Sequence, residues 1–311
     1  MATTTLARTF TGANGQVNKW TYSFWVKRSS LGLQVMTAPR FNGNFTGQIK
    51  FTASDQLEVN DYRNSYLLQK TTNRLFRDTS AWYHIVVSND NTVSSPDTKI
   101  YVNGVEETSF ATDNEYSQND TNSFNNDYPN YIGEKGTGDQ FDGLMSHFHF
   151  IDGTAYTAST FGSTDATTGE WKINTSPSVT YGTNGFFILK DGNSVTDQSG
   201  NNNNWTVDSG TLTKTEDNPS NVFATLNSLN IPTSNAPSFS NGSTTSITNS
   251  TSGSYKWGGC TTLGMTSGKF YCEAKATVDS SYSRNVIGIT GDSANIARAN
   301  GSILNGTHSW G

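Results

Sequence analysis

Residues Trp82 to Gly104 form the stretch that decides the fold. It consists of the run Trp82-Tyr-His-Ile-Val-Val-Ser-Asn-Asp90, a polar loop of eight residues, and the run Lys99-Ile-Tyr-Val-Asn-Gly104. Both runs are rich in β-branched and aromatic residues, which predicts an antiparallel hairpin. Because alternate side chains point to opposite faces of a strand, the first run is apolar on both faces and the second on one. We therefore expect the first run to be a central strand. Asn103-Gly104 supplies the positive φ of a tight turn.

Strand signals continue on both sides of this hairpin. Residues 20–27 alternate strictly and place Trp20, Tyr22, Phe24 and Val26 on one face. Further strand-like runs lie at residues 48–53, 56–59, 66–70, 131–134, 141–152 and 186–190. Within 141–152, the side chains of Leu144, Phe148 and Phe150 are expected on one face. Trp205-Thr-Val is expected to close a sheet against the N-terminal strand.

The composition agrees with an all-β protein. Hydrophobic residues make up 33% of the chain and aromatic residues 12%, so Trp, Tyr and Phe are expected to fill the core. No segment keeps a helical apolar period long enough for a stable helix; residues 155–161 form a turn or two at most. The net charge is −6 and Lys and Arg are scattered, which argues against a nucleic-acid partner. No signal peptide and no membrane-inserted segment are predicted.

Three regions are expected along the chain. Residues 1–215 are expected to form a β-sandwich, residues 216–254 an Asn/Ser/Thr-rich linker, and residues 255–311 the beginning of a second β-sandwich. The linker is expected to touch the first domain through Val222, Phe223 and Leu226. In the last region, residues 255–260 and 268–276 are expected to pair as a hairpin, with a strand following at 285–290.

The order of several motifs resembles that of laminin G-like lectin domains in structural proteins of marine tailed phages, which infect cyanobacteria or pelagic bacteria. The motifs are Ala7-Arg-Thr, Trp20-Thr-Tyr-Ser-Phe-Trp-Val-Lys-Arg-Ser, Trp82-Tyr-His, Ile100-Tyr-Val-Asn-Gly, Phe141-Asp-Gly, Ser199-Gly-Asn, Trp205-Thr and Asp217-Asn-Pro-Ser-Asn-Val-Phe-Ala-Thr-Leu-Asn. After them, Gly268-Lys-Phe-Tyr-Cys-Glu resembles the opening strand of SPRY-type domains. The resemblance implies that residues 1–215 form a concanavalin A-like jelly-roll domain and that residues 255–311 begin an SPRY-like one. It also implies a virion protein, in a tail fibre or another surface appendage.

The loop of residues 111–130 is the candidate for ligand contact. Sugar rings present apolar C–H faces and hydroxyl groups, so lectin sites combine an exposed aromatic ring with amide and carboxylate groups. Tyr116, Phe124 and Tyr128 stand among Asn and Asp residues in this loop and are the predicted carbohydrate-binding residues. A solvated loop or a contact between subunits is the alternative.

Metal and catalytic sites are not predicted. His147 and His149 share a strand face, but a third ligand for a metal is missing, and His84 is expected to be a packed strand residue. Asp90 and Asp142 beside strand ends are expected to be turn residues, although a calcium ion is possible at such a rim. No cofactor is therefore assigned.

Enzymatic and redox chemistry are equally unsupported by the sequence. Retaining glucanases use paired carboxylates on one strand face, and no such run exists in the chain. Cys260 and Cys272 are expected to be buried thiols rather than a disulfide. The chain is therefore expected not to be an enzyme.

These features together favour a non-enzymatic virion protein, made in the host cytoplasm, that recognises host-surface glycans. Its expected partners are other virion proteins, a host glycan and further copies of itself. The first alternative is a purely architectural protein that decorates a capsid or cements a tail and binds only virion proteins. The second is a polysaccharide depolymerase.

Overall fold

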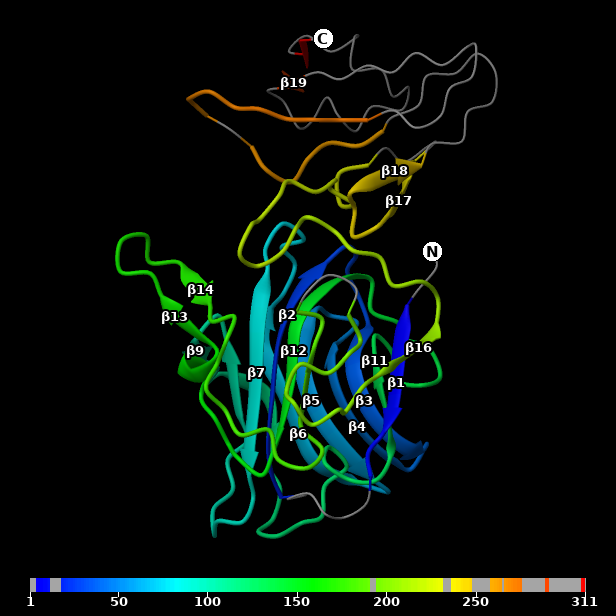
Figure 1. Ribbon diagram of the computed structural model, residues 1–311, viewed down its shortest axis with the longest axis vertical. Helices are drawn as coiled ribbons and strands as arrows, with labels where there is room; N and C mark the ends of the chain where they lie inside the picture. The colour runs from blue at the N-terminus through cyan, green and yellow to red at the C-terminus, as the bar shows by residue number, and fades with distance from the viewer. Residues whose placement is uncertain are drawn as a thin grey trace. The chain divides into compact units, whose positions relative to one another are not determined.

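The computed structural model describes residues 4–11, 18–190, 194–231, 236–247, 258–264, 266–275, 289–290 and 309–310 (Figure 1). The chain divides into two compact units, Met1–Phe223 and Ala224–Gly311. The boundary expected near residue 215 stays a prediction. In the part of the chain that is described, no helix is long and apolar enough to cross a membrane.

The first unit is a sandwich of two antiparallel sheets, as predicted from the alternating sequence (Figure 1). The larger sheet has eight strands in the order β10 (Phe110–Asn114), β6 (Tyr66–Leu75), β5 (Gln56–Arg63), β4 (Phe45–Phe51), β3 (Gln34–Asn42), β11 (Pro129–Ile132), β1 (Thr5–Thr9) and β16 (Thr206–Ser209). Strand β16 pairs with β1, so the prediction that Trp205-Thr-Val closes a sheet against the N-terminal strand is confirmed.

The smaller sheet has six strands and contains the hairpin that the sequence analysis began with. Its order is β15 (Phe186–Ile188), β12 (Gly143–Asp152), β2 (Lys19–Arg28), β7 (Tyr83–Asp90), β8 (Lys99–Val102) and β9 (Val105–Glu106). Strand β7 lies between β2 and β8, which confirms its central place. Asn103 and Gly104 have φ angles of 49° and 81° and turn the chain into β9, as predicted.

Aromatic rings fill the space between the two sheets. Trp20, Tyr22, Phe24 and Val26 are all at most 1% exposed, so the predicted inner face of β2 is confirmed. Phe24 stacks on Phe148 of β12 with ring centroids 4.6 Å apart. Because each buried aromatic side chain removes a large apolar area from water, a chain with few leucines still forms a core.

A β-bulge in β12 changes which residues of that strand face the core. The pairing of β12 with β2 shifts between Ser146 and His149, and His147 has a φ of 47°. Met145 packs against the core before the bulge, and Phe148 and Phe150 do so after it. Placing Leu144 on the same face as Phe148 was therefore wrong, because the extra residue reverses the alternation.

A second apolar layer covers the outer face of the smaller sheet. Val86, Tyr101 and Ile151 on that face pack with Ala158 and Phe161 from the chain that follows β12. This chain includes the short 3₁₀ helix η2 (Ala158–Thr160) and a hairpin of β13 (Gly162–Thr164) and β14 (Trp171–Ile173). Strand β8 was expected to be buried on one face, and this layer is why Tyr101 is buried as well.

Residues 215–223, which we call the strap, are held on the first unit by a buried ion pair. Lys27 Nζ lies 2.8 Å from Asp217 Oδ2, and the two side chains are 2% and 0% exposed. Asp217 Oδ1 also accepts hydrogen bonds from Trp82 Nε1 at 3.2 Å and from the backbone N–H of Phe223 at 2.9 Å. The sequence placed this contact on Val222, Phe223 and Leu226. Val222 lies beside Trp25 and Trp82, and Val222 and Phe223 are each 44% exposed, so the buried part of the contact is made by Asp217.

The second unit contains short strand pairs in its described residues. Strands β17 (Ser238–Ser240) and β18 (Thr245–Ile247) form one pair, and β19 (Ile289–Thr290) and β20 (Ser309–Trp310) form another. The hairpin predicted for 255–260 with 268–276 lies partly outside the described residues. Its described part forms no strand, and of the strand predicted at 285–290 only β19 is described.

Candidate functional site

Two of the three predicted sugar-binding rings lie inside the core. Tyr116 is 3% exposed and Phe124 is 0% exposed. The hydroxyl of Tyr116 donates to Asp61 Oδ2 at 3.0 Å, and the ring of Phe124 lies 4.6 Å from that of Trp20. The expectation that these rings form an exposed platform is wrong, because they fill the end of the sandwich core.

Tyr128, the third predicted ring, lies just below the surface. It is 9% exposed, packs against Phe41 with ring centroids 5.4 Å apart, and accepts a hydrogen bond from Arg63 Nη2 at 3.1 Å. Phe41, which the sequence analysis did not select, is 64% exposed. Its position next to the turn Asn42-Gly43-Asn44 was the signal that a ring would be exposed there. Sugar binding by Tyr116, Phe124 and Tyr128 stays a prediction.

A buried carboxylate fixes the loop that carries these rings. Asp61 is 0% exposed and accepts hydrogen bonds from the backbone N–H of Ser123 at 2.6 Å and from Ser123 Oγ at 2.7 Å. Burial raises the pKa of Asp61, although these bonds and the one from Tyr116 act in the opposite direction. An Asp at an inward position of an alternating strand was the available sequence signal for such an anchor.

The histidines of the smaller sheet are structural side chains in this arrangement. His84 is 1% exposed and stacks on Trp25 with ring centroids 4.8 Å apart, as expected for a packed strand residue. His84 Nδ1 accepts the N–H of Trp171 at 3.0 Å, so its proton is on Nε2 and is donated to Ser23 Oγ at 2.9 Å. Among the described residues, no three His, Cys, Asp or Glu side chains are grouped as metal ligands.

We expect His84 to make the first unit less stable in acid. Burial, with a smaller contribution from the charge of His147, lowers the pKa of His84 to about 3, whereas an unfolded histidine titrates near ~6.5. Between these values only the unfolded chain binds the proton, so stability falls as the pH drops. Going from pH 7 to pH 4.5 should cost about 2 kcal/mol through this residue.

Urea unfolding at the two pH values, followed by tryptophan fluorescence, measures this loss. In His84→Gln the difference between pH 7 and pH 4.5 should shrink by about the same 2 kcal/mol. An unchanged difference would show that His84 is not the group responsible.

The outer face of the larger sheet carries a connected set of polar side chains, which we call the polar face. It consists of Lys50 on β4, Glu58 and Asn60 on β5, and Gln69 and Thr71 on β6. Leu57 and Val59 alternate with these β5 residues and lie in the core, so Glu58 and Asn60 must point outward. Strand pairing sets Glu58 opposite Thr71 and Asn60 opposite Gln69.

Glu58 holds the polar face together. It lies 3.0 Å from Lys50 Nζ and accepts hydrogen bonds from Asn60 Nδ2 at 2.6 Å and Thr71 Oγ1 at 2.9 Å. Burial alone would raise the pKa of Glu58, but Lys50 and these donors hold it below its usual value. The carboxylate is therefore charged at neutral pH and fixes the amide groups beside it.

Two tyrosines stand at one end of the polar face. Tyr62 and Tyr66 lie opposite each other on β5 and β6, with ring centroids 5.2 Å apart in an edge-to-face arrangement. Tyr66 is 46% exposed. Burial, then the charge of Glu58, raises the pKa of Tyr66. This surface joins an exposed ring to fixed hydrogen-bonding groups.

The sequence profile of the concanavalin A-like lectin/glucanases superfamily matches residues 3–159. The chain belongs to this superfamily. The matched residues run from the N-terminal strand through η2 and include both tyrosines and the whole polar face. The predicted concanavalin A-like jelly roll is thereby confirmed. A comparison with curated protein sequences gives no match.

Several solved structures are similar to this superfamily member at low sequence identity. Domain 4 of AbnA, an extracellular GH43 arabinanase of Geobacillus stearothermophilus solved with arabinotriose, is 21% identical, with a TM-score of 0.37 over 46% of this chain and 64% of that one. A heptameric SAP-like pentraxin of Limulus polyphemus is 15% identical, with a TM-score of 0.39 over 68% and 91%. A putative carbohydrate binding protein of Bacteroides ovatus is 18% identical, with a TM-score of 0.43 over 72% and 63%. At these identities the likeness concerns the fold alone.

Glucanases of this superfamily would need a pair of carboxylates, and β5 does not supply one. Glu58 shares the outer face with Asn60 and Tyr62, whereas Asp61 points into the core. Retaining hydrolysis requires a second carboxyl group beside the first. Strand β5 therefore does not bring two carboxylates to one face.

Of the two aspartates considered for calcium, Asp90 has the side-chain contacts of an ordinary turn residue. Asp90 Oδ2 lies 2.7 Å from Lys19 Nζ, and Asp90 Oδ1 accepts hydrogen bonds from the backbone N–H and the hydroxyl of Thr92 at 3.1 and 2.6 Å. The backbone carbonyl of Asp142 accepts the N–H of Ser29 at 2.9 Å. These contacts agree with the turn interpretation of Asp90.

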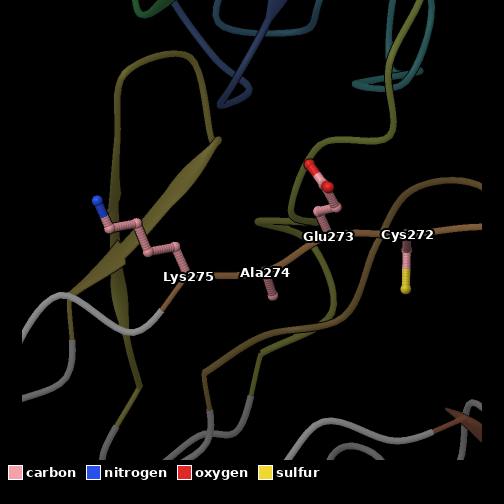
Figure 2. A pocket seen from close by; sticks show the side chains of 4 residues that line it. All are labelled: Cys272, Glu273, Ala274 and Lys275. Carbon is pink, nitrogen blue, oxygen red and sulfur yellow. The ribbon is translucent and has the colours of Figure 1, made fainter.

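The second unit has a hollow of about 560 Å³ beside Cys272, Glu273, Ala274 and Lys275 (Figure 2). In Figure 2 the side chains of Glu273 and Lys275 lie on one side of the extended segment, and those of Cys272 and Ala274 on the other. They do not converge on a ligand. Both cysteines are free thiols, as predicted, but Cys272 is exposed rather than buried.

Proposed function

We propose that this protein is a non-enzymatic virion component whose concanavalin A-like domain binds glycans on a host cell surface. The observation that carries the glycan proposal is the polar face with Tyr62 and Tyr66 at its end. A pyranose ring can lie on the exposed ring of Tyr66, while the partly exposed amide group of Gln69 is within reach of its hydroxyls. Glu58 accepts a hydrogen bond from Gln69 Nε2 at 3.4 Å and so fixes this amide before the ligand arrives, which lowers the entropy cost of binding.

The virion proposal rests on the order of motifs along the chain. This order, from Ala7-Arg-Thr to the strap sequence, resembles that of phage structural proteins. A tail fibre or surface appendage presents many copies of one domain, so weak sugar contacts add up to firm attachment. Further copies of the chain and other virion proteins are therefore its proposed partners. The likeness of residues from Gly268 to an SPRY-type domain belongs to the same proposal.

Replacing Tyr66 by Ala should weaken glycan binding at least tenfold. The substitution removes the ring on which a sugar would lie, and a base or sugar face on an aromatic ring contributes on the order of 1–3 kcal/mol. The measurement is binding of the full-length chain to intact host cells and to purified envelope polysaccharide. Phe41→Ala is the matched control, because Phe41 is also open to solvent, at 64% against 46% for Tyr66, but lies outside the polar face.

Equal binding by the Tyr66→Ala variant and the unaltered chain would contradict the assignment of the polar face. Absence of binding by the unaltered chain, even when it is multimerised on a bead, would contradict the glycan proposal itself. Immunogold labelling of purified particles tests the virion proposal separately, since a protein that is not part of the particle gives no label.

The architectural alternative also has an observation in its favour. Phe41, Phe45 and Tyr128 form an aromatic cluster with Arg63 at one end of the sandwich, and Phe41 is 64% exposed. Exposed aromatic side chains next to arginine are typical of protein contacts. If Phe41→Ala prevents incorporation into particles while glycan binding persists, this cluster joins the protein to the virion.

A further inference from the structure

We infer that the first unit has a second saccharide site, a tryptophan-lined pocket on the smaller sheet that accepts one pyranose ring. The pocket is a hollow of about 250 Å³ whose walls include Trp25, Trp82 and Trp171. These residues come from β2, the segment before β7, and β14. Because the volume is below that of most sites for larger ligands, it suits a single sugar ring rather than a length of chain.

Each of the three indoles is fixed by a contact with the protein interior. Trp25 stacks on His84, Trp171 donates its N–H to His84 Nδ1, and Trp82 donates its N–H to Asp217. The indole N–H groups of Trp82 and Trp171 are therefore occupied, and these rings offer carbon surface to the pocket. An apolar, preorganised surface of this kind suits the C–H face of a sugar.

Glycines allow Trp171 to take its position. A side chain on Gly104 would come within 2.3 Å of the Trp171 ring, and one on Gly162 within 2.6 Å. Gly104 also has a φ of 81°, which few other residues adopt. The two glycines thus let the turn after β8 and the β13–β14 hairpin pack closely against the indole ring of Trp171.

Two polar side chains of the pocket remain available to a ligand. Asn103 uses Oδ1 to accept the backbone N–H of His84 at 2.7 Å, which leaves its NH₂ group for a sugar hydroxyl. Glu170 is exposed, and its Oε2 lies 2.6 Å from Lys172 Nζ. The other carboxylate oxygen can accept a hydroxyl. Since Lys172 balances this charge, a neutral sugar fits better than a cation.

The strap completes the pocket. Pro219 and Val222 form part of its wall, and Asp217 anchors the strap beside them. The docked strap therefore supplies one wall of the pocket. The inference rests on the proposed glycan function for its ligand class, but not on the polar face, which belongs to the other sheet.

The test is a fluorescence titration of the full-length chain with methyl α-glucoside, methyl α-mannoside, methyl β-galactoside and N-acetylglucosamine. At least one of them should give a saturable change in tryptophan emission. The change should persist in Tyr66→Ala and weaken at least tenfold in Val222→Trp and Glu170→Gln. Val222 is 44% exposed and Glu170 is exposed, so neither substitution disturbs the core. Equal urea midpoints confirm folding.

Four outcomes would overturn the inference. One is that none of the four sugars changes the emission, even if cells still bind through the polar face. Another is a sugar response that Val222→Trp leaves intact. The third is saturable quenching by tetramethylammonium in place of the sugars, which would make the three indoles a cation site. Loss of the response in Tyr66→Ala alone would assign it to the polar face and so also reject the pocket.

Discussion

Asp217→Asn is expected to lower the free energy of unfolding of the first unit by about 3–5 kcal/mol. The substitution keeps the size of the side chain but leaves Lys27 charged at a position where its side chain is 2% exposed. Removing one member of a buried ion pair is costly because the remaining charge has lost its solvent and its partner. Urea unfolding of the full-length chain, followed by tryptophan fluorescence, measures the change.

Two further variants decide whether the buried charge is the cause. Asp90→Asn breaks the Lys19–Asp90 pair, whose side chains are 33% and 27% exposed, and should cost less than about 1 kcal/mol. The double variant Lys27→Met/Asp217→Leu removes both buried charges and should recover much of the lost stability. A double variant as unstable as Asp217→Asn would show that the hydrogen bonds to Trp82 and Phe223 matter more than the charge.

The strap illustrates what the sequence could not show. The stretch from residue 216 is rich in Asn, Ser and Thr, so composition predicts a linker with apolar contacts. The buried anchor is Asp217, a residue type that is almost never buried without a partner. Its partner, Lys27, is 190 positions away in sequence. No local sequence pattern indicates an ion pair between residues so far apart in the chain.

The strands were predictable because their signal is local. Alternation placed Trp20, Tyr22 and Phe24 in the core and placed β7 in the middle of its sheet. The same alternation placed Leu144 on the wrong face, because the bulge near His147 inserts one extra residue into the strand. The spacing of apolar residues in the sequence does not indicate where such a residue is inserted. The polar composition of the loop after β10 also led to a wrong prediction, that its aromatic rings are exposed. In the structure, buried Asn and Ser side chains of this loop lie among buried rings.

Only part of the polar face could be predicted from the sequence. Alternation in Gln56–Arg63 indicates that Glu58, Asn60 and Tyr62 share a face. The register that brings Tyr66, Gln69 and Thr71 opposite them depends on an irregularity in the pairing of β5 with β6. A surface built from several strands therefore becomes visible only once their register is known.

Phe124→Ala is expected to destabilise the first unit by about 3–5 kcal/mol. The ring is fully buried, lies 4.6 Å from Trp20 and 5.8 Å from Tyr22, and leaves a large cavity when it is removed. A side chain added at Gly47 would come within 3.0 Å of the same ring, so the surrounding backbone is already close. Thermal or urea unfolding of the full-length chain measures the loss.

Phe41→Ala again provides the comparison, and it should change stability by less than about 0.5 kcal/mol, because Phe41 is 64% exposed. The pair separates two roles for the loop of residues 111–130. If Phe124 belongs to the core, its removal lowers stability, and any loss of glycan binding follows from unfolding and is reversed by cooling or by a stabilising osmolyte. A Phe124→Ala chain of normal stability that no longer binds glycan would instead mean that the loop opens and uses its rings on the ligand, as the sequence alone predicted.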